Sequence, residues 1–216
     1  MRFTKQQYRT REERHQFLLK TYSNCFSNNI LNVGGGGEKH LAKYLNKEVD
    51  YFEIDIAGKP DLIFNLEKDD LKIFKTNQFD TVLCTDVLEH INDFHNVFEH
   101  LLRISNKNVI ISLPNSYQSI LEILSSQNTM KFYGLPIKKP EDRHKWFFSA
   151  TDIESFFINS SSIYNYKIKT LILLGLDYDR GIIKNTIYFI LKLFLSKKQY
   201  KNLRTQTVWV HLTANH

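Results

Sequence analysis

The stretch Asn29-Ile30-Leu31-Asn32-Val33-Gly34-Gly35-Gly36-Gly37-Glu38 places half of the chain's glycines in a single turn. The apolar residues before the glycines predict a buried strand, and the apolar spacing within 39–45 predicts a helix after them. Glycine can adopt positive φ or approach a ligand closely because it lacks Cβ, and a helix start offers free N–H groups and a positive dipole end. The stretch therefore predicts a strand–turn–helix unit that binds a polar or anionic ligand.

The spacing of the glycines argues against two common nucleotide-binding loops. A G-x-G-x-x-G dinucleotide fingerprint would need a third glycine at Lys39 or His40, and a Walker A loop would need Gly-Lys-Ser/Thr at its end. NAD, FAD and nucleoside triphosphates are therefore disfavoured. An ordinary tight turn is the alternative interpretation, although one or two glycines would suffice for it.

The composition is typical of one globular domain. The chain has 216 residues, of which 42% are hydrophobic and 24% are charged, enough for a core around one sheet. The net charge of +6 allows attraction to nucleic acid, anionic lipid or a phosphorylated substrate without choosing among them. Cys25 and Cys84 are expected to be buried thiols in a reducing compartment. No secretory signal and no spanning apolar run is found, so we expect a cytoplasmic protein.

Seven segments of the sequence are predicted to be strands of one sheet. The continuous apolar run of 79–85 is typical of a strand buried on both faces, as in a parallel sheet covered by helices. We therefore expect an α/β, Rossmann-like, doubly wound sheet with helices on both faces, in which the last two strands are antiparallel to each other. The predicted strands are 30–33, 49–55, 61–64, 79–85, 108–113, 164–174 and 205–213.

Asp55 ends the second predicted strand, about twenty residues after the glycines. In a doubly wound sheet this strand ends beside the first, so Asp55 can reach a ligand of the glycine loop. A carboxylate there suits a ribose diol, because it can accept two hydroxyl hydrogen bonds. A solvated loop aspartate is the alternative.

The segment 86–102 predicts a long helix after the strand 79–85. Asp86 and Glu89 fit a capping box at its start, in which each side chain satisfies a free backbone N–H. The helix dipole disfavours the cationic form of His90, so a neutral imidazole there is a candidate general base. A metal site made of these three residues would need a further ligand that the sequence does not indicate, and we expect none.

Two segments are expected to cover the sheet and the site. Residues 4–22 predict a cationic amphipathic helix over an edge of the sheet, within an N-terminal helical cover at 1–27 that could instead touch a substrate. The long connection 127–149 predicts a lid or insertion over an acceptor site. It contains His144, and the aromatic residues 146–148 that follow could wall an acceptor pocket. A surface histidine beside core aromatics is an equal alternative.

The segment 181–195 is strongly apolar and is followed by four basic residues. A core helix or a helix that packs in a homodimer is the favoured interpretation, and an interfacial membrane helix with a basic flank is the alternative. The second interpretation would place the chain at the inner membrane surface. The basic residues are Lys197, Lys198, Lys201 and Arg204.

Five stretches in order, ILNVGGGG, YFEIDI, FDTVLCTDVLEHI, VIISLPN and HKWFFS, together resemble a class I S-adenosylmethionine-dependent methyltransferase. The resemblance covers about residues 28–160. Within the class, the chain is most similar to the small type 11 domains related to quinone-biosynthesis methyltransferases. It implies one methyltransferase domain over 1–216, with a seven-stranded, mostly parallel sheet whose last strand is antiparallel. It also implies S-adenosylmethionine as the cofactor, lying across the carboxyl edge of the sheet.

The same resemblance implies individual roles in cofactor binding. Gly34 and Gly36 would line the methionine part, Asp55 would bind the ribose, and Thr85 and Asp86 would lie near the sulfonium. Asn65 and Leu66 would flank the adenine. The complete expected set is Asn32, Gly34, Gly35, Gly36, Asp55, Ile56, Asn65, Leu66, Thr85 and Asp86.

Three residues depart from the family's pattern. Asn32 and Asn65 stand where acids are common, and as amides they are expected to weaken cofactor binding without abolishing it. Glu38 stands where a third glycine is common, and it would either favour a helix start or crowd the methionine carboxylate. These departures keep open a catalytically silent partner subunit with a methyltransferase fold.

We therefore predict a methyltransferase that acts on a small-molecule, glycan or lipid-linked acceptor, with O-methylation favoured. Such an enzyme mainly orients the nucleophile and excludes water, and His90 or His144 would serve as the catalytic base. Methylation of nucleic-acid amino groups is disfavoured, because Thr85-Asp86-Val87-Leu88 replaces the acid/Asn-Pro-Pro-aromatic motif that those enzymes share. A third hypothesis is a peripheral membrane enzyme that uses 181–204 to reach a lipid-linked substrate.

Overall fold

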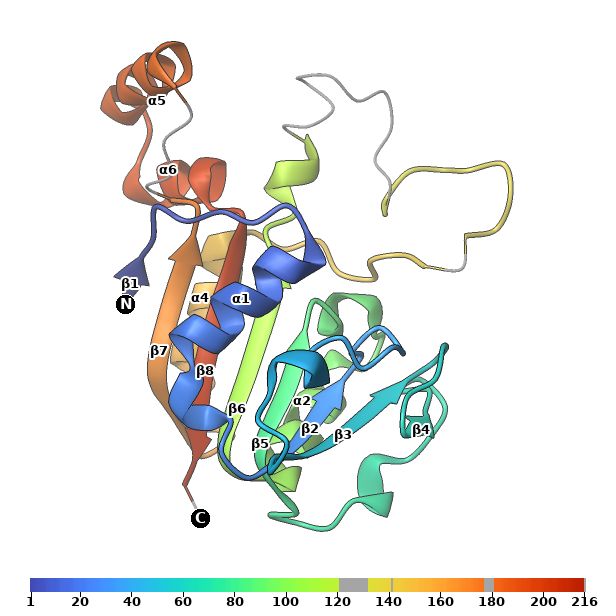
Figure 1. Cartoon of the computed structure of the whole chain (residues 1–216). Coiled ribbons are helices and arrows are strands. Elements are labelled where there is room, and N and C mark those ends of the chain that lie inside the picture. Colours follow the sequence, from blue (N-terminus) through green and yellow to red (C-terminus); the bar gives the residue numbers. More distant parts are fainter. Residues whose placement is uncertain (121–131, 141, 177–180, 216) are drawn as a thin grey trace.

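The computed structural model describes residues 1–120, 132–140, 142–176 and 181–215. They form one sheet with helices packed on it (Figure 1). The strands are β1 Arg2–Phe3, β2 Asn29–Val33, β3 Asp50–Asp55, β4 Leu62–Ile63, β5 Phe79–Thr85, β6 Ser105–Pro114, β7 Tyr166–Leu174 and β8 Thr207–Ala214. The α-helices are α1 Arg11–Thr21, α2 Phe94–Ile104, α4 Ala150–Asn159, α5 Ile182–Phe194 and α6 Lys197–Arg204. Short 3₁₀ turns are η1 Ser23–Cys25, η2 Ala42–Tyr44, η3 Leu71–Ile73 and η4 Leu88–His90.

The strand order is β1-β7-β8-β6-β5-β2-β3-β4. Only β8 runs antiparallel to its neighbours, β6 and β7, among the described strands. The predicted Rossmann-like sheet and its seven strands are confirmed. The eighth strand, β1, has two residues that pair in parallel with β7. Its exposed side chains carry no apolar alternation, so the sequence offers no signal for it.

Two apolar cores lie on opposite faces of the sheet. On one face α1 packs over the middle strands, where the ring of Phe17 lies 5.2 Å from that of the fully buried Trp209. On the other face α2 and α4 pack together, with Phe98 and Phe157 centroids 5.6 Å apart. The helix expected at the edge of the sheet therefore covers a face, because β8 supplies Trp209 as its partner.

The prediction of a helix after the glycines is wrong. Residues 39–45 contain only the single turn η2, and of their apolar side chains only Leu41 is buried. Lys39 takes a left-handed φ of 50°, and its N–H donates to the side chain of Glu53 at 3.2 Å instead of to a helix. The loop is therefore held by contacts to β3 and does not start a helix.

The long helix predicted over 86–102 begins later than expected. Its α-helical part is α2, which starts at Phe94 and is capped by Asp93. Asp86 has a φ of 54°, a conformation that cannot precede a helix as its cap, so the capping box of Asp86 and Glu89 is wrong. The residues between form η4, which frees both carboxyl groups for other contacts.

The remaining predictions outside the sheet have mixed outcomes. Both cysteines are buried free thiols, and 181–204 forms α5 and α6. The predicted lid at 127–149 lies partly outside the described residues. Within the described part of the chain, no helix combines the length and apolarity needed to cross a membrane.

Candidate functional site

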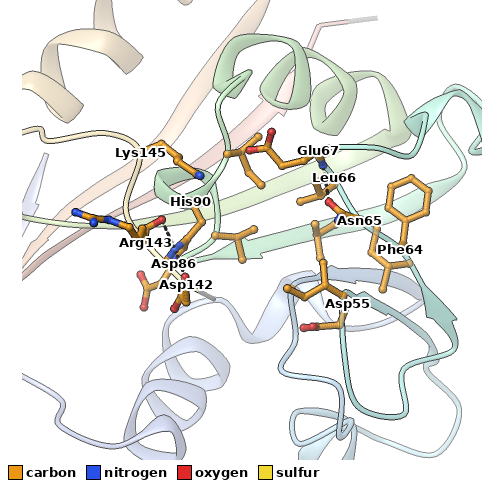
Figure 2. Close-up of a pocket in the computed structure, with 16 residues that line it drawn as sticks. Asp55, Phe64, Asn65, Leu66, Glu67, Asp86, His90, Asp142, Arg143 and Lys145 are labelled. Atoms are coloured by element: carbon orange, nitrogen blue, oxygen red, sulfur yellow. Dashed lines mark hydrogen bonds and ion pairs between the residues drawn. The ribbon is translucent and has the colours of Figure 1, made fainter. Parts of the chain in front are cut away.

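A cavity of about 370 Å³ opens at the carboxyl ends of β2, β3 and β5. Its size lies within the ~300–1,000 Å³ typical of small-molecule sites. Figure 2 shows Asp55 and Asn65 on one side and His90, Asp86 and Asp142 on the other. The cavity is lined by Val33, Gly34, Ile54, Asp55, Ile56, Phe64, Asn65, Leu66, Glu67, Asp86, Val87, His90, Ile91, Asp142, Arg143 and Lys145.

The cavity gathers most of the residues expected to bind the cofactor. Those that line it are Gly34, Asp55, Ile56, Asn65, Leu66 and Asp86. Those that do not are Asn32, Gly35, Gly36 and Thr85. His90 lines the cavity too, whereas His144 does not.

The glycine loop is fastened to the end of β3. The N–H of Gly34 donates to the carbonyl of Ile54 at 2.8 Å, and the N–H of Gly36 donates to Asp55 Oδ2 at 2.8 Å. A Cβ at Gly35 or Gly36 would overlap the side chains of Glu53 and Arg11, respectively. The buried Glu53 carboxylate therefore requires glycine at position 35, and the left-handed φ of 95° favours it at position 36. Of the four loop glycines, Gly34 alone lines the cavity.

Glu53, which the sequence analysis did not single out, anchors the loop from below. Its side chain is completely buried, and its Oε2 accepts from Tyr51 OH at 2.5 Å and from Asn32 Nδ2 at 3.3 Å. Asn32 is thus a donor beneath the loop and does not reach the cavity. The available signal was a charged residue inside the apolar strand YFEIDI, since a charge there needs partners.

Asp55 and Asn65 stand at the cavity with part of their hydrogen-bonding capacity used. Besides Gly36, the Asp55 carboxylate accepts from the N–H of Ala57 at 3.2 Å. A carboxylate has about four acceptor sites, so two remain for hydroxyl donors. The Asn65 Oδ1 accepts from the N–H of Glu67 at 2.9 Å, which fixes the turn below the cavity.

Glu38 has no helix to cap and does not line the cavity. Its carboxylate is exposed and lies 2.9 Å from His40 Nε2. The role at a helix start is therefore wrong, and the crowding of the methionine carboxylate stays a prediction.

Asp86 joins the cavity to a second, basic cleft. Its Oδ2 accepts from Arg14 Nη1 at 2.7 Å and its Oδ1 accepts from Ser112 Oγ at 2.6 Å. Arg9, Arg11 and Arg14 line this cleft of about 570 Å³, and Asp86 belongs to both. Basic residues of 4–22 thus lie beside the cavity, and their contact with a substrate stays a prediction.

Hydrogen bonds to two backbone carbonyls, one in η4 and one at the residue after it, tie this region to the segment 142–146. The N–H of Lys145 donates to the carbonyl of Glu89 at 2.7 Å, and Trp146 Nε1 donates to the carbonyl of Ile91 at 2.7 Å. These bonds bring His144 to His90, whose ring centroid lies 4.6 Å away in an edge-on arrangement. Both predicted bases therefore meet in space.

The two ring nitrogens of His90 have different surroundings. Its Nδ1 lies 2.6 Å from Asp142 Oδ1 and 3.2 Å from the carbonyl of Arg143. Two acceptors at Nδ1 assign the hydrogen to that nitrogen, which leaves Nε2 to take a proton. Asp142, which the sequence analysis did not identify, therefore orients the histidine.

His144 is more enclosed than His90. It stacks on Phe132 at 4.3 Å, and its Nδ1 lies 3.0 Å from Tyr133 OH. Burial, followed by the nearby His90, lowers the pKa of His144 to about 4. An imidazole with that pKa is neutral at pH 7 but binds a proton weakly, which makes His144 a weak base.

The aromatic residues after His144 do not wall the main cavity. Trp146 and Phe148 pack against the core and line a separate apolar hollow of about 150 Å³ beside α2 and α4. Phe147 is half exposed and contacts Tyr133. The main cavity is walled on this side by polar residues of 142–145, and an aromatic wall of an acceptor pocket stays a prediction.

Glu89 is a buried acid without a complete set of partners. Its side chain is 1% exposed, and its Oε2 has no hydrogen-bond partner in the described structure. Burial, followed by repulsion from Asp86, raises its pKa well above the usual value. Its Oε1 lies 3.8 Å from His90 Nε2.

One oxygen of Glu89 and one nitrogen each of His90 and His144 lie within 4.8 Å of one another. His144 is the further ligand that the sequence did not indicate, whereas Asp86 is bonded elsewhere. Donor atoms of a tetrahedral zinc site lie about 3.3 Å apart, given bonds of roughly 2.0–2.1 Å. These three residues could hold a metal ion only after they move closer together.

Comparisons with known proteins agree with this architecture. A family model described as a methyltransferase domain matches residues 3–159. No curated protein matches the sequence. A structure of an S-adenosylmethionine-dependent methyltransferase from Clostridium acetobutylicum aligns with a TM-score of 0.58 and 12% identity, over 96% of this chain and 93% of that chain. A SAM-dependent methyltransferase from Archaeoglobus fulgidus aligns with a TM-score of 0.55 and 15% identity, over 94% of each chain. At such identities the structural likeness shows a shared fold.

Proposed function

The chain belongs to the methyltransferase-domain family, and on that premise we propose that it transfers the methyl group of S-adenosylmethionine to a hydroxyl group of a small-molecule, glycan or lipid-linked acceptor. The observation that carries the proposal is the cavity at the carboxyl edge of the sheet. It combines a carboxylate suited to a ribose with a histidine whose Nε2 can take a proton. Within the family, we also propose the type 11 relationship, on the five stretches quoted above.

The residues present fit such a cofactor. Asp55 has two acceptor sites left for the ribose hydroxyls, while Asn65 and Leu66 offer an amide and an apolar surface for the adenine. Arg11 and Arg14 line the adjoining cleft and can hold the methionine carboxylate. When bound, S-adenosylmethionine supplies a methyl group activated by a positively charged sulfur.

His90 is the proposed base. Its Nε2 would accept the proton of the acceptor hydroxyl as that oxygen takes the methyl group, and Asp142 at Nδ1 would stabilise the resulting charge. Lys145 and Arg143 line the same side of the cavity and can hold an anionic part of the acceptor. His144 contacts the His90 ring and limits its rotation, so it is a positioning residue.

One observation favours the second candidate function, a catalytically silent partner subunit. Several polar groups expected to face a cofactor are already engaged within the protein. The Gly36 N–H bonds Asp55, and Asp86 is bonded to Arg14 and Ser112. A silent subunit would keep these contacts for stability alone.

Thermal unfolding with S-adenosylmethionine, S-adenosylhomocysteine and NAD tests the proposal. A ligand at 100 times its Kd adds about 2.7 kcal/mol to the free energy of unfolding. We expect a rise in Tm with both adenosyl compounds and none with NAD. No rise at millimolar concentration of either adenosyl compound would favour the silent subunit.

A pair of variants on β3 locates the binding. Asp55→Ala should abolish the rise in Tm, because it removes the groups proposed to bind the ribose. Asp50→Ala changes an exposed carboxylate at the opposite end of the same strand and should leave the rise intact. Equal ligand responses in the two variants would show that the cofactor does not bind at Asp55.

A further inference from the structure

Helix α5 exposes an unusual amount of apolar surface. Phe189, Leu193 and Phe194 have exposed fractions of 65%, 69% and 81%. Figure 1 shows the helix standing away from the sheet, beyond α6. Further exposed apolar side chains on α5 are Ile182, Ile187 and Ile190. Proteins in water rarely expose such a contiguous apolar patch unless another molecule covers it.

The inner side of α5 is held against α6 by a few contacts. The guanidinium of Arg204 lies over the Tyr188 ring at 4.4 Å, and Lys192 lies over the Tyr200 ring at 5.7 Å. Lys201 of α6 is in turn paired with Glu154 of α4 at 2.8 Å. The helix is thus fixed to the body of the protein while its opposite side faces outward.

The charge of this region is entirely positive. Residues 181–204 contain six basic residues and no acidic residue. Lys197 and Lys198 at the start of α6 are exposed. A second copy of the chain would bring the same positive charges together, whereas an anionic lipid surface would neutralise them. The charge therefore favours a membrane over self-association as the cover of α5.

The position of α5 relates this surface to the candidate site. The helix follows β7, whose carboxyl end lies at the same edge of the sheet as the cavity. The segment 132–140 also lies at this edge (Figure 1). A membrane in contact with α5 would therefore face the side of the molecule where the cavity opens.

We propose that α5 and α6 form a docking surface for an anionic membrane. The apolar side of α5 lies in the headgroup region, and Lys197 and Lys198 contact the lipid phosphates. This inference rests on the proposed function, because it selects one of the three acceptor classes named there. The acceptor it selects is the lipid-linked one. An acceptor held in the membrane would be brought to the cavity by the docking itself.

Co-sedimentation of the full chain with vesicles tests the docking surface. We expect binding to vesicles of phosphatidylcholine and phosphatidylglycerol, and much weaker binding to phosphatidylcholine alone. The double variant Phe189→Gln/Leu193→Gln should weaken binding by about tenfold or more, because two apolar side chains no longer enter the lipid. The matched control Ile73→Gln/Ile163→Gln changes two exposed isoleucines at the opposite edge of the sheet and should bind as the wild type does.

A second pair of variants tests the charge. Each lysine near an anionic surface contributes about a fivefold gain in affinity, so Lys197→Gln/Lys198→Gln should weaken binding by about 25-fold. Lys43→Gln/Lys47→Gln removes two exposed lysines far from α5 and should have little effect. Equal losses from both lysine pairs would show that overall charge, and not this surface, binds the vesicles.

Two other measurements keep the inferences separable. If the wild type fails to bind anionic vesicles, or if the α5 variant binds as tightly as its control, the docking surface is disproved. A dimer in light scattering that the α5 variant dissociates, without vesicle binding, would assign α5 to a second copy instead. A retained rise in Tm with S-adenosylhomocysteine would show in either case that the cofactor part of the proposed function survives.

Discussion

The polar groups that stand behind the two walls of the cavity differ in how they are satisfied. On the β2–β3 wall, Glu53 is buried with three side-chain partners or backbone donors, and the glycine loop is bonded to Asp55. On the opposite wall, Glu89 is equally buried but leaves an oxygen unpaired, and His144 has a strongly lowered pKa. Groups that are fully paired stabilise a fold, while perturbed groups in a cleft are typical of chemistry. We infer that the first wall governs stability and cofactor affinity, and the second governs rate.

The largest effect expected on the second wall is on turnover. His90→Gln should lower kcat by about 10²–10⁴-fold, because it removes the proposed base. Methyl transfer to the acceptor would be measured together with the Kd for S-adenosylhomocysteine. An unchanged Kd with reduced kcat would support the division between the walls. A wild-type kcat would show that the acceptor needs no base at this position.

On the first wall the largest effect should be on stability. Gly37 has a φ of 69°, and a Cβ there would overlap the carbonyl of Ala57. Gly37→Ala should therefore lower the free energy of unfolding by about 3 kcal/mol, from the left-handed backbone and the overlap together. Gly181→Ala is the matched control, because Gly181 has a φ of 85° but no described residue has an atom within 4 Å of the added Cβ.

Denaturant unfolding of both glycine variants checks this prediction. Gly181→Ala should lower the free energy of unfolding by only about 1 kcal/mol, the cost of a left-handed backbone at alanine. If the two variants lose the same stability, the close approach of the glycine loop to residues 57–58 does not stabilise the first wall.

Replacing the unpaired acid of the second wall should increase stability at neutral pH. The pKa of Glu89 is raised in the folded state. At pH 7 the Glu89 carboxyl ionises more readily in the unfolded state, and this difference favours unfolding. Glu89→Gln should raise the free energy of unfolding at pH 7, because glutamine has no carboxyl group that must stay protonated in the buried position. The gain should disappear below about pH 4.5, where the unfolded carboxyl is protonated too. A loss of stability at pH 7 would show that the Glu89 carboxylate is ionised and held by a partner such as a metal ion.

The smallest effect is expected at His144. Its folded pKa of about 4 lies below the unfolded value of 6.5, so between these pH values the unfolded state binds the extra proton and stability falls as the pH falls. Relative to the wild type, His144→Gln should therefore gain about 1 kcal/mol on going from pH 7 to pH 5, after allowance for partial solvent exposure. The free energies of unfolding at the two pH values, measured for both proteins, check this. His15, on the opposite face, has a pKa lowered to about 4 by burial and should behave in the same direction.

Local patterns predicted the strands well and the helices at the site poorly. The strand 79–85 was predicted with its exact bounds, because an unbroken apolar run depends only on neighbouring residues. The helix predicted after the glycines does not form, because the Lys39 N–H donates to Glu53, a residue of another strand. The capping box at Asp86 failed for the same reason, since Arg14 and Ser112 hold that carboxylate.

The sequence by itself determined the Rossmann-like sheet, the position of the glycine turn and the acid at the end of β3, because the apolar period and the turn residues act over a few positions. Only the tertiary structure decided which distant groups meet. Arg14 reaches Asp86 across 72 positions. His144 reaches His90 because the Lys145 N–H and the Trp146 indole N–H donate to carbonyls of η4 and the residue after it. Such contacts depend on how the chain returns to the sheet, and no local period encodes that return.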